Sequence, residues 1–119
     1  MNLEVFVDKR LREQDKGLLN GMDRRIAEVM YHDYVFSKDV NLRYPNGESL
    51  VDLYLRVKEL MNDINNYENS LIVTHRGVIN MIYYLTCGDE LDMNKGRYGV
   101  THGSIHELNT GKVKIRRIK

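Results

Sequence analysis

The sequence predicts an α/β fold, with a layered sheet, flanking helices and a C-terminal antiparallel hairpin. Short apolar runs typical of strands alternate with segments of helical periodicity, and two strand-like runs end the chain. The 119 residues are 42% apolar and 29% charged, which is typical of a folded globular protein. We therefore expect a single domain over residues 1–119.

The first 49 residues are predicted to contain one short strand, one helix and two loops. Residues 4–7, Glu-Val-Phe-Val, form a short β-like run, and a polar stretch with two glycines follows up to residue 21. Positions 22, 26, 29 and 30 then place apolar side chains at helical spacing, and Asp23 suits the N-terminus of that helix. Residues 37–49 contain the only proline and are predicted to form a loop.

The clearest helical pattern covers residues 50–64, where apolar side chains form one stripe. The stripe consists of Leu50, Leu53, Tyr54, Val57, Leu60, Met61 and Ile64. Ser49 and Asp52 resemble a capping box in which Asp replaces the usual Glu. We therefore expect an amphipathic helix with a defined start.

A strand, a tight turn and a second helix are predicted in immediate succession from residue 70. The run Ser-Leu-Ile-Val-Thr at 70–74 suits a strand buried on both faces, as in a parallel sheet. His75 and Gly77 interrupt this run, and the apolar residues of 78–85 then predict a helix. After a loop at 89–101, the segments 104–108 and 113–118 predict two strands joined by a turn.

His75 lies at the junction that says most about function. Ligands of open α/β sheets bind at the carboxyl ends of strands, and a helix N-terminus there offers free N–H groups and the positive end of a dipole. This placement predicts an anionic ligand, phosphate above all, with His75 as a donor to phosphate or as an acid or base. The same pattern also fits a buried histidine whose ring bonds to a backbone carbonyl.

Two loops carry weaker signals. In residues 11–17, Leu-Arg-Glu-Gln-Asp-Lys-Gly, Glu13 is a candidate general acid for a leaving alkoxide, although a solvated charged loop also fits. Residues 44–49, Tyr-Pro-Asn-Gly-Glu-Ser, fit a turn that leads into a helix cap. We refer to residues 11–21 as the acid loop and to residues 44–49 as the proline loop.

Taken in order, four segments resemble the histidine phosphatase, or phosphoglycerate-mutase-like, superfamily. The acid loop is similar to the family's L-R-E loop, and the proline loop to its P-x-G-E-S loop. Residues 71–79 are similar to its second-histidine motif, and residues 103–108 to its closing strand. The resemblance implies a phosphoglycerate-mutase-like fold and phosphoryl transfer from a phosphomonoester through a phosphohistidine, in a phosphatase or a mutase.

The resemblance also implies roles for five residues. Glu13 corresponds to the proton donor for the leaving group, and His75 to the second histidine, which holds phosphate oxygens. The backbone N–H groups that follow His75, including that of Gly77, would face the phosphate. Arg76 stands where the family usually has a small residue and His102 where a small polar residue is common, and both are candidates for phosphate contact. No metal or other cofactor is implied, because a cationic pocket supplies the electrostatic stabilisation.

The family's N-terminal Arg-His-Gly motif is absent, and no Arg-His dipeptide occurs in the sequence. We therefore expect an incomplete, truncated domain that keeps the acid and second-histidine half and is inactive alone. The apolar strand at 71–73 would lack a neighbour, which predicts self-association or pairing with a separate N-terminal piece. The alternative is a non-catalytic module that binds phosphate, another anion or a protein.

Other functional classes fit the sequence less well. A metal site at His102 and His106 lacks a nearby third ligand. The net charge of +1 and the apolar residues interleaved in the basic tail argue against nucleic acid as a partner. No signal peptide or membrane-length apolar stretch is present, and the lone Cys87 favours a reducing compartment, so we expect a cytoplasmic protein.

Overall fold

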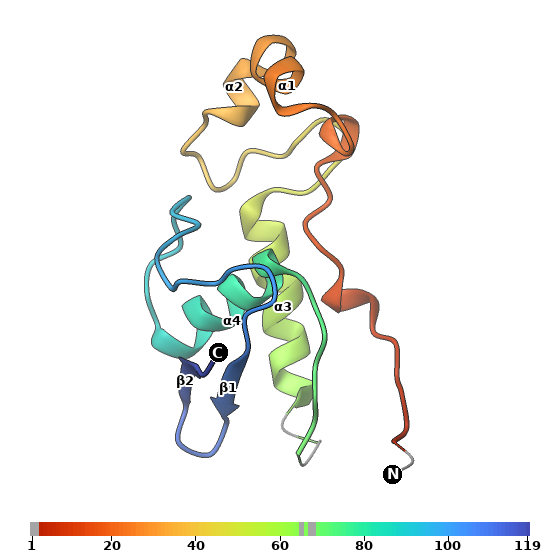
Figure 1. The fold of residues 1–119 in the computed structure, drawn as a ribbon. Coiled ribbons are helices and arrows are strands. Elements are labelled where there is room, and N and C mark those ends of the chain that lie inside the picture. The colour runs from red at the N-terminus through yellow and green to blue at the C-terminus, as the bar shows by residue number, and fades with distance from the viewer. Residues whose placement is uncertain (1–2, 65, 67–68) are drawn as a thin grey trace.

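The computed structural model of the chain describes residues 3–64, 66 and 69–119. Two longer helices and a C-terminal hairpin dominate it, and short helical turns precede them (Figure 1). In chain order the elements are η1 (Lys9–Leu11), η2 (Gly17–Leu19), α1 (Arg24–Met30), α2 (His32–Val35), α3 (Leu50–Ile64), α4 (Arg76–Cys87), β1 (His106–Asn109) and β2 (Lys114–Arg117). The predicted helices near 22–30, 50–64 and 78–85 are thereby confirmed, whereas α2 lies where no helix was predicted.

Helices α3 and α4 pack against each other and form the core. Their buried cluster consists of Leu53, Val57, Val78, Met81, Ile82 and Tyr84. Val57 and Val78 are fully inaccessible to solvent. Burying a side chain of this kind stabilises a fold by about 1.5–3 kcal/mol, so this helix pair supplies much of the apolar stabilisation.

The starts of the helices carry the caps that the sequence predicts. Asp52 N–H donates to Ser49 Oγ at 3.0 Å, and Ser49 N–H donates back to Asp52 Oδ2 at 2.9 Å, so the capping box of α3 is confirmed. Asp23 caps α1, because its Oδ1 accepts from the N–H of Arg25 at 2.9 Å. Helix α4 ends at Gly88, whose φ of +72° is a conformation that glycine adopts at little cost.

The C-terminal hairpin is confirmed. Strands β1 and β2 pair antiparallel with Leu108 opposite Ile115, and both side chains pack against the α3–α4 cluster. The connection spans 110–113, and the Oδ1 of Asn109 accepts from the backbone N–H of Lys112 at 3.1 Å. The hairpin is thus fixed to α4 as well as within itself.

The layered sheet is the part of the predicted fold that the structure does not contain. Within the described ranges, β1 and β2 form the one sheet, and residues 4–7 and 70–74 are not strands. A strand pairs its N–H and C=O groups with those of a neighbouring strand, and within the described ranges neither run is part of a sheet. Val7 and Val73 are accordingly 93% and 83% exposed. We refer to residues 3–7 and 70–74 as the two extended runs (Figure 1).

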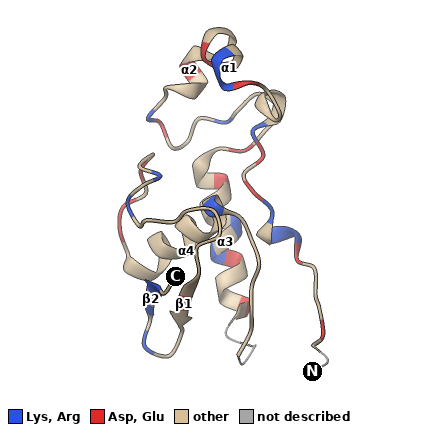
Figure 2. Ribbon diagram, in the orientation of Figure 1, with Lys and Arg blue, Asp and Glu red and all other residues tan. Residues whose placement is uncertain are grey.

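Charged residues of both signs alternate along the acid loop and along α3, as Figure 2 shows. Helices α1 and α2 lie at the opposite end of the molecule from the hairpin (Figure 1). In the part of the chain that the structure describes, no helix is both long and apolar enough to cross a membrane.

Candidate functional site

A cavity of about 210 Å³ lies between the acid loop, helices α3 and α4, and the loop at 89–101. Four of the five predicted site residues line it: Glu13, Arg76, Gly77 and His102. His75 is not among the lining residues. The fold therefore brings segments that are far apart in the sequence to the lining of one cavity.

The Glu13 carboxylate sits against the start of helix α4. Its Oε2 accepts from the backbone N–H of Gly77 at 3.2 Å, and its Oε1 accepts from the N–H of Gln14 at 2.9 Å. A Cβ at position 77 would lie 2.2 Å from the same Oε1, so only glycine allows this approach without a shift of the carboxylate. The first turn of α4 thus donates a free N–H to an acidic group, as helix N-termini favour.

His75 is the N-cap residue of α4 and has extended backbone angles, with φ −100° and ψ 159°. Its carbonyl accepts from the N–H of Ile79 at 3.1 Å, as the first bond of the helix. Its side chain is exposed, and the ring makes no hydrogen bond to any residue that the structure describes. The alternative of a buried, carbonyl-bonded histidine does not match this placement, and the ring is accessible to a ligand from solvent.

Arg76 bridges α4 to the loop that walls the cavity. Its Nε donates to the carbonyl of Val100 at 2.9 Å, and its Nη2 donates to the carbonyl of Lys95 at 3.1 Å. The guanidinium therefore positions this loop as well as lining the cavity. His102 is exposed in a turn at the rim and precedes Gly103, which has a φ of +76°.

The comparison with known families supports the motif reading. The sequence matches the family described as Histidine phosphatase superfamily (branch 1) over residues 1–119. This chain belongs to the histidine phosphatase superfamily.

One curated relative is a fructose-2,6-bisphosphatase of Saccharomyces cerevisiae. It is 33% identical over 78 residues, which cover 63% of this chain and 17% of that protein. The chain thus spans about a sixth of the length of the curated relative that it matches.

Two lysines of this histidine phosphatase chain line the cavity and were not predicted to do so. Neither the Lys16 nor the Lys95 ammonium forms an ion pair with any described residue. Desolvation, followed by the charges of Lys16, Arg24 and Arg76, lowers the pKa of Lys95, and Glu13 acts in the opposite direction. Of these groups, Lys16, Arg76 and Glu13 also line the cavity. Lys16 could have been noticed inside the acid loop, whereas nothing in the sequence marks Lys95.

Asn80 also lines the cavity, and sequence reasoning missed it. It is 5% exposed, its Nδ2 donates to the carbonyl of Lys95 at 3.3 Å, and its buried Oδ1 has no hydrogen-bond partner among the residues that the structure describes. A polar residue inside the apolar run 78–85 was the available signal. A buried acceptor without a donor is costly, which makes it a place where a ligand hydroxyl or amine would be stabilised.

The His106 side chain, weighed above as a metal ligand with His102, is hydrogen-bonded to two neighbouring side chains. The His106 ring bonds to Tyr83 Oη through Nδ1 at 2.6 Å and to Ser104 Oγ through Nε2 at 2.8 Å, so both of its nitrogens are engaged. Burial and then the charge of Arg117 lower the pKa of His106. Across the described residues, no group of three or more His, Cys, Asp or Glu side chains is arranged to hold a metal ion.

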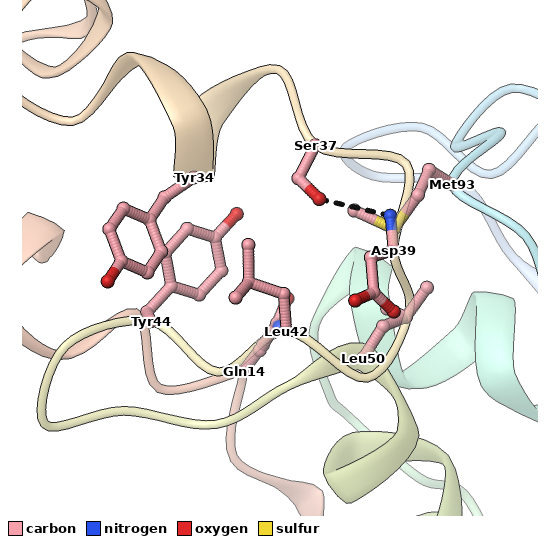
Figure 3. Close-up of a pocket in the computed structure, with 8 residues that line it drawn as sticks. All are labelled: Gln14, Tyr34, Ser37, Asp39, Leu42, Tyr44, Leu50 and Met93. Atoms are coloured by element: carbon pink, nitrogen blue, oxygen red, sulfur yellow. Dashed lines mark hydrogen bonds between the residues drawn. The ribbon is translucent and has the colours of Figure 1, made fainter.

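A second, much smaller pocket adjoins the cavity and shares Gln14, Tyr44, Leu50 and Met93 with it. Figure 3 shows Tyr34 and Tyr44 beside each other in this pocket, and their stacked ring centroids are 6.5 Å apart. Its volume of about 10 Å³ is near the minimum for a single water molecule. It is therefore a packing gap beside the site rather than a substrate pocket.

Proposed function

We propose that this chain supplies the acid and second-histidine half of a site that transfers the phosphoryl group of a phosphomonoester. The contact that carries the proposal joins the Glu13 carboxylate to the Gly77 N–H at 3.2 Å, across 64 positions of sequence. A proton-donor candidate and a helix N-terminus suited to phosphate thereby meet on the wall of one cavity. Membership of the histidine phosphatase superfamily supports the same chemistry.

In the proposed reaction, Glu13 donates a proton to the leaving alkoxide oxygen while His75 and the N–H groups at the start of α4 hold the phosphate oxygens. A positioned general acid typically contributes about 10²–10⁴-fold to such a step. A nucleophilic histidine attacks phosphorus, the bond from phosphorus to the leaving oxygen breaks, and water or an acceptor substrate later takes the phosphoryl group. Because these 119 residues contain no Arg-His-Gly motif, we propose that a segment outside them supplies this histidine.

The lining of the cavity supports an anionic substrate. Lys16 and Lys95 have no ion-pair partner among the described residues, and Arg76 adds a third cation. His102 stands at the rim, where a phosphate oxygen can reach it from solvent. Preorganised positive groups in a partly enclosed cavity stabilise developing negative charge without a metal. We accordingly assign Arg76, Gly77 and His102 to phosphate binding, together with His75.

The two extended runs support a proposal about the missing part. Leu71 and Val73 are 84% and 83% exposed, although their alternation with half-buried neighbours is that of a strand. A strand that carries the nucleophile would pair with this run and cover its apolar side chains. We propose that this strand belongs to a separate piece of protein or to another part of a longer chain, and that without it the chain associates with itself.

The name of the yeast relative specifies a fructose bisphosphate as its substrate. For this chain we propose the broader class of phosphomonoesters, acted on by hydrolysis or by transfer to an acceptor, in the cytoplasm. A non-catalytic phosphate-binding or interaction module is the second candidate. It is favoured by the placement of His75 outside the cavity lining and by the hydrogen bonds that tie Arg76 to loop carbonyls.

The test is hydrolysis of a generic aryl phosphate by the folded chain, with Glu13→Gln and His75→Ala as companions. The chain alone is expected to show no turnover above buffer, and addition of an Arg-His-Gly-bearing strand is expected to produce turnover that both variants lose. Turnover by the chain alone that both variants abolish would show that one of its own residues is the nucleophile. Turnover of the complemented protein that survives Glu13→Gln would refute the role of Glu13.

A further inference from the structure

One arginine on helix α3 forms hydrogen bonds to the backbone of the segment that contains Glu13. Arg56 Nη1 donates to the carbonyls of Arg10 at 2.8 Å and Arg12 at 2.7 Å. Its Nη2 also donates to the carbonyl of Glu13 itself at 3.4 Å. This segment belongs to no regular helix or sheet beyond the short η1 turn, so its carbonyls need donors from elsewhere. A single guanidinium supplies them to three of four successive carbonyl groups.

The fourth carbonyl in this segment, that of Leu11, accepts from Thr74 Oγ1 at 2.6 Å. Thr74 directly precedes the histidine that starts helix α4. The backbone leading to Glu13 is therefore held by α3 on one side and by the residues before α4 on the other. No side chain of the acid loop is needed for either contact.

Glu48 completes the arrangement from the proline loop. Its carboxylate accepts from Arg56 Nε at 3.1 Å and Nη2 at 2.8 Å, and the side chains of Arg56 and Glu48 are only 10% and 16% exposed. Glu48 Oε1 also accepts from the N–H of Asp15 at 2.8 Å, and the N–H of Glu48 donates to the carbonyl of Asp15 at 2.7 Å. Gln14 Nε2 adds a bond to the Glu48 carbonyl at 3.3 Å. Glu13 thus lies between backbone groups that this ion pair fixes on both sides.

Two glycines allow the loops to approach this closely. A Cβ on Gly17 would lie 1.9 Å from the carbonyl oxygen of Pro45, and a Cβ on Gly47 would lie 2.5 Å from that of Asp15. Leu18 N–H donates to the same Pro45 carbonyl at 2.9 Å. The acid loop and the proline loop are therefore in backbone contact, and Arg56 forms hydrogen bonds with both of them.

We propose that Arg56 and Glu48 are positioning residues that hold the Glu13 carboxylate against the start of helix α4. The proposal rests on the proposed role of Glu13, and it adds two residues that touch neither substrate nor the reacting atoms. Arginine is required at position 56 because its planar fork presents donors in several directions at once, whereas a lysine ammonium is a single point. Burial raises the pKa of Glu48, but the hydrogen bonds from Arg56 and from Asp15 N–H outweigh it, and the net pKa is lowered. The carboxylate therefore stays ionised as a partner for the guanidinium.

The experiment compares Arg56→Lys with Arg43→Lys by nuclear magnetic resonance of the full chain. Arg43 is a matched control, since it pairs with Asp52 of the same helix at 2.9 Å and has no contact with the acid loop. In wild type and in Arg43→Lys, we expect a nuclear Overhauser effect between the Glu13 side chain and the Gly77 α protons, and a Gly77 amide shift typical of a carboxylate-bonded N–H. Arg56→Lys is expected to lose both signals while the α3–α4 core signals stay in place.

A retained Glu13–Gly77 contact in folded Arg56→Lys would overturn the proposal. If that variant does not fold, Glu48→Gln provides the test of the proposal. Glutamine keeps the size of the side chain and an acceptor for the Asp15 N–H. It removes the negative charge and places an amide NH2 against the Arg56 guanidinium, so the ion pair is lost. An unchanged Gly77 amide in Glu48→Gln would contradict the proposal. In Arg56→Ala, added guanidinium below denaturing concentrations is expected to restore the contact, which a merely structural defect would not permit. Because the readout is a contact and not turnover, failure of the phosphatase proposal leaves this result unaffected.

Discussion

The α3–α4 pair and the two extended runs are built from similar apolar side chains, yet they differ almost completely in burial. Val57 and Val78 in the helices are fully buried, whereas Val7 and Val73 in the extended runs are 93% and 83% exposed. A helix satisfies its own backbone, so it needs only one apolar neighbour to be stable. An extended run usually buries its side chains by pairing into a sheet, and within the described residues neither run belongs to one. The comparison separates a helix pair that buries its apolar side chains within the described residues from two runs whose apolar side chains remain exposed.

The largest difference between the two regions is expected when the same substitution, Leu→Ala, is made once in each of them. Leu53→Ala in the core is expected to lower the free energy of unfolding by about 2–5 kcal/mol, because it leaves a cavity between α3 and α4. Leu71→Ala in the extended run is expected to change it by less than about 0.5 kcal/mol. Urea unfolding of both variants checks the pair. Similar losses in the two variants would mean that Leu71 is buried in solution.

Self-association is the next largest effect. The exposed apolar side chains of the extended runs are expected to drive it, and fully burying one valine side chain is worth about 1.5–3 kcal/mol. Val73→Lys should therefore weaken association by roughly tenfold or more. Sedimentation velocity over a range of concentrations measures this, with Val113→Lys in the hairpin turn as the exposed control. If the wild type is monomeric at all concentrations, the claim that the extended runs drive self-association is contradicted.

The capping box of α3 provides an effect of about 1 kcal/mol. Ser49→Ala removes the acceptor for the Asp52 N–H in a buried position, and the loss of a side-chain cap typically costs about 0.5–2 kcal/mol. Ser70→Ala, at an exposed serine of the extended run, should be neutral. Thermal unfolding of both variants distinguishes them, and an equal shift in midpoint would contradict the assignment of the cap.

Acid should destabilise the proline-loop contacts through Glu48. Its folded pKa lies below the ordinary value of 4.5, so the folded state binds fewer protons than the unfolded state at low pH. The stabilisation is complete above about pH 4.5 and is lost as the pH falls through and below that value. In Glu48→Gln the dependence of unfolding free energy on pH should be shallower in this range. An unchanged slope would place the acid sensitivity on other carboxylates, such as Asp8, whose pKa is lowered to about 2 by hydrogen bonds from Arg10.

Gly77→Ala should have the smallest effect on stability and the clearest effect on the site. Alanine favours a helix over glycine by at most about 1 kcal/mol, which offsets the lost hydrogen bond to Glu13. The new Cβ displaces the Glu13 carboxylate, which would otherwise lie 2.2 Å away. The unfolding free energy should therefore change by less than about 1 kcal/mol while the Glu13–Gly77 nuclear Overhauser effect disappears. A retained effect would contradict the close approach of the Glu13 carboxylate to position 77, because the new Cβ would then have displaced nothing.

The sequence predicts the helices and the hairpin well because their signals are local. The stripe of 50–64, the Ser49–Asp52 box and the hairpin near residue 110 each depend on neighbours a few positions away. The extended runs could not be predicted correctly, since their state depends on a pairing partner and not on their own composition. Motif order singled out Glu13 and Gly77, which line the cavity, but not Lys95, because no local pattern marks a cation that a loop brings to the cavity.

The most direct test of the central claim is a titration of inorganic phosphate into the isotope-labelled chain, followed at the backbone amides. Saturable shifts are predicted at Arg76 and Gly77 and along the acid loop, with none in the β1–β2 hairpin. In His75→Ala the affinity should fall by about tenfold, which corresponds to roughly 1.4 kcal/mol. Shifts confined to the basic hairpin, or an affinity that His75→Ala leaves unchanged, would contradict the claim that the start of helix α4 is half of a phosphate site.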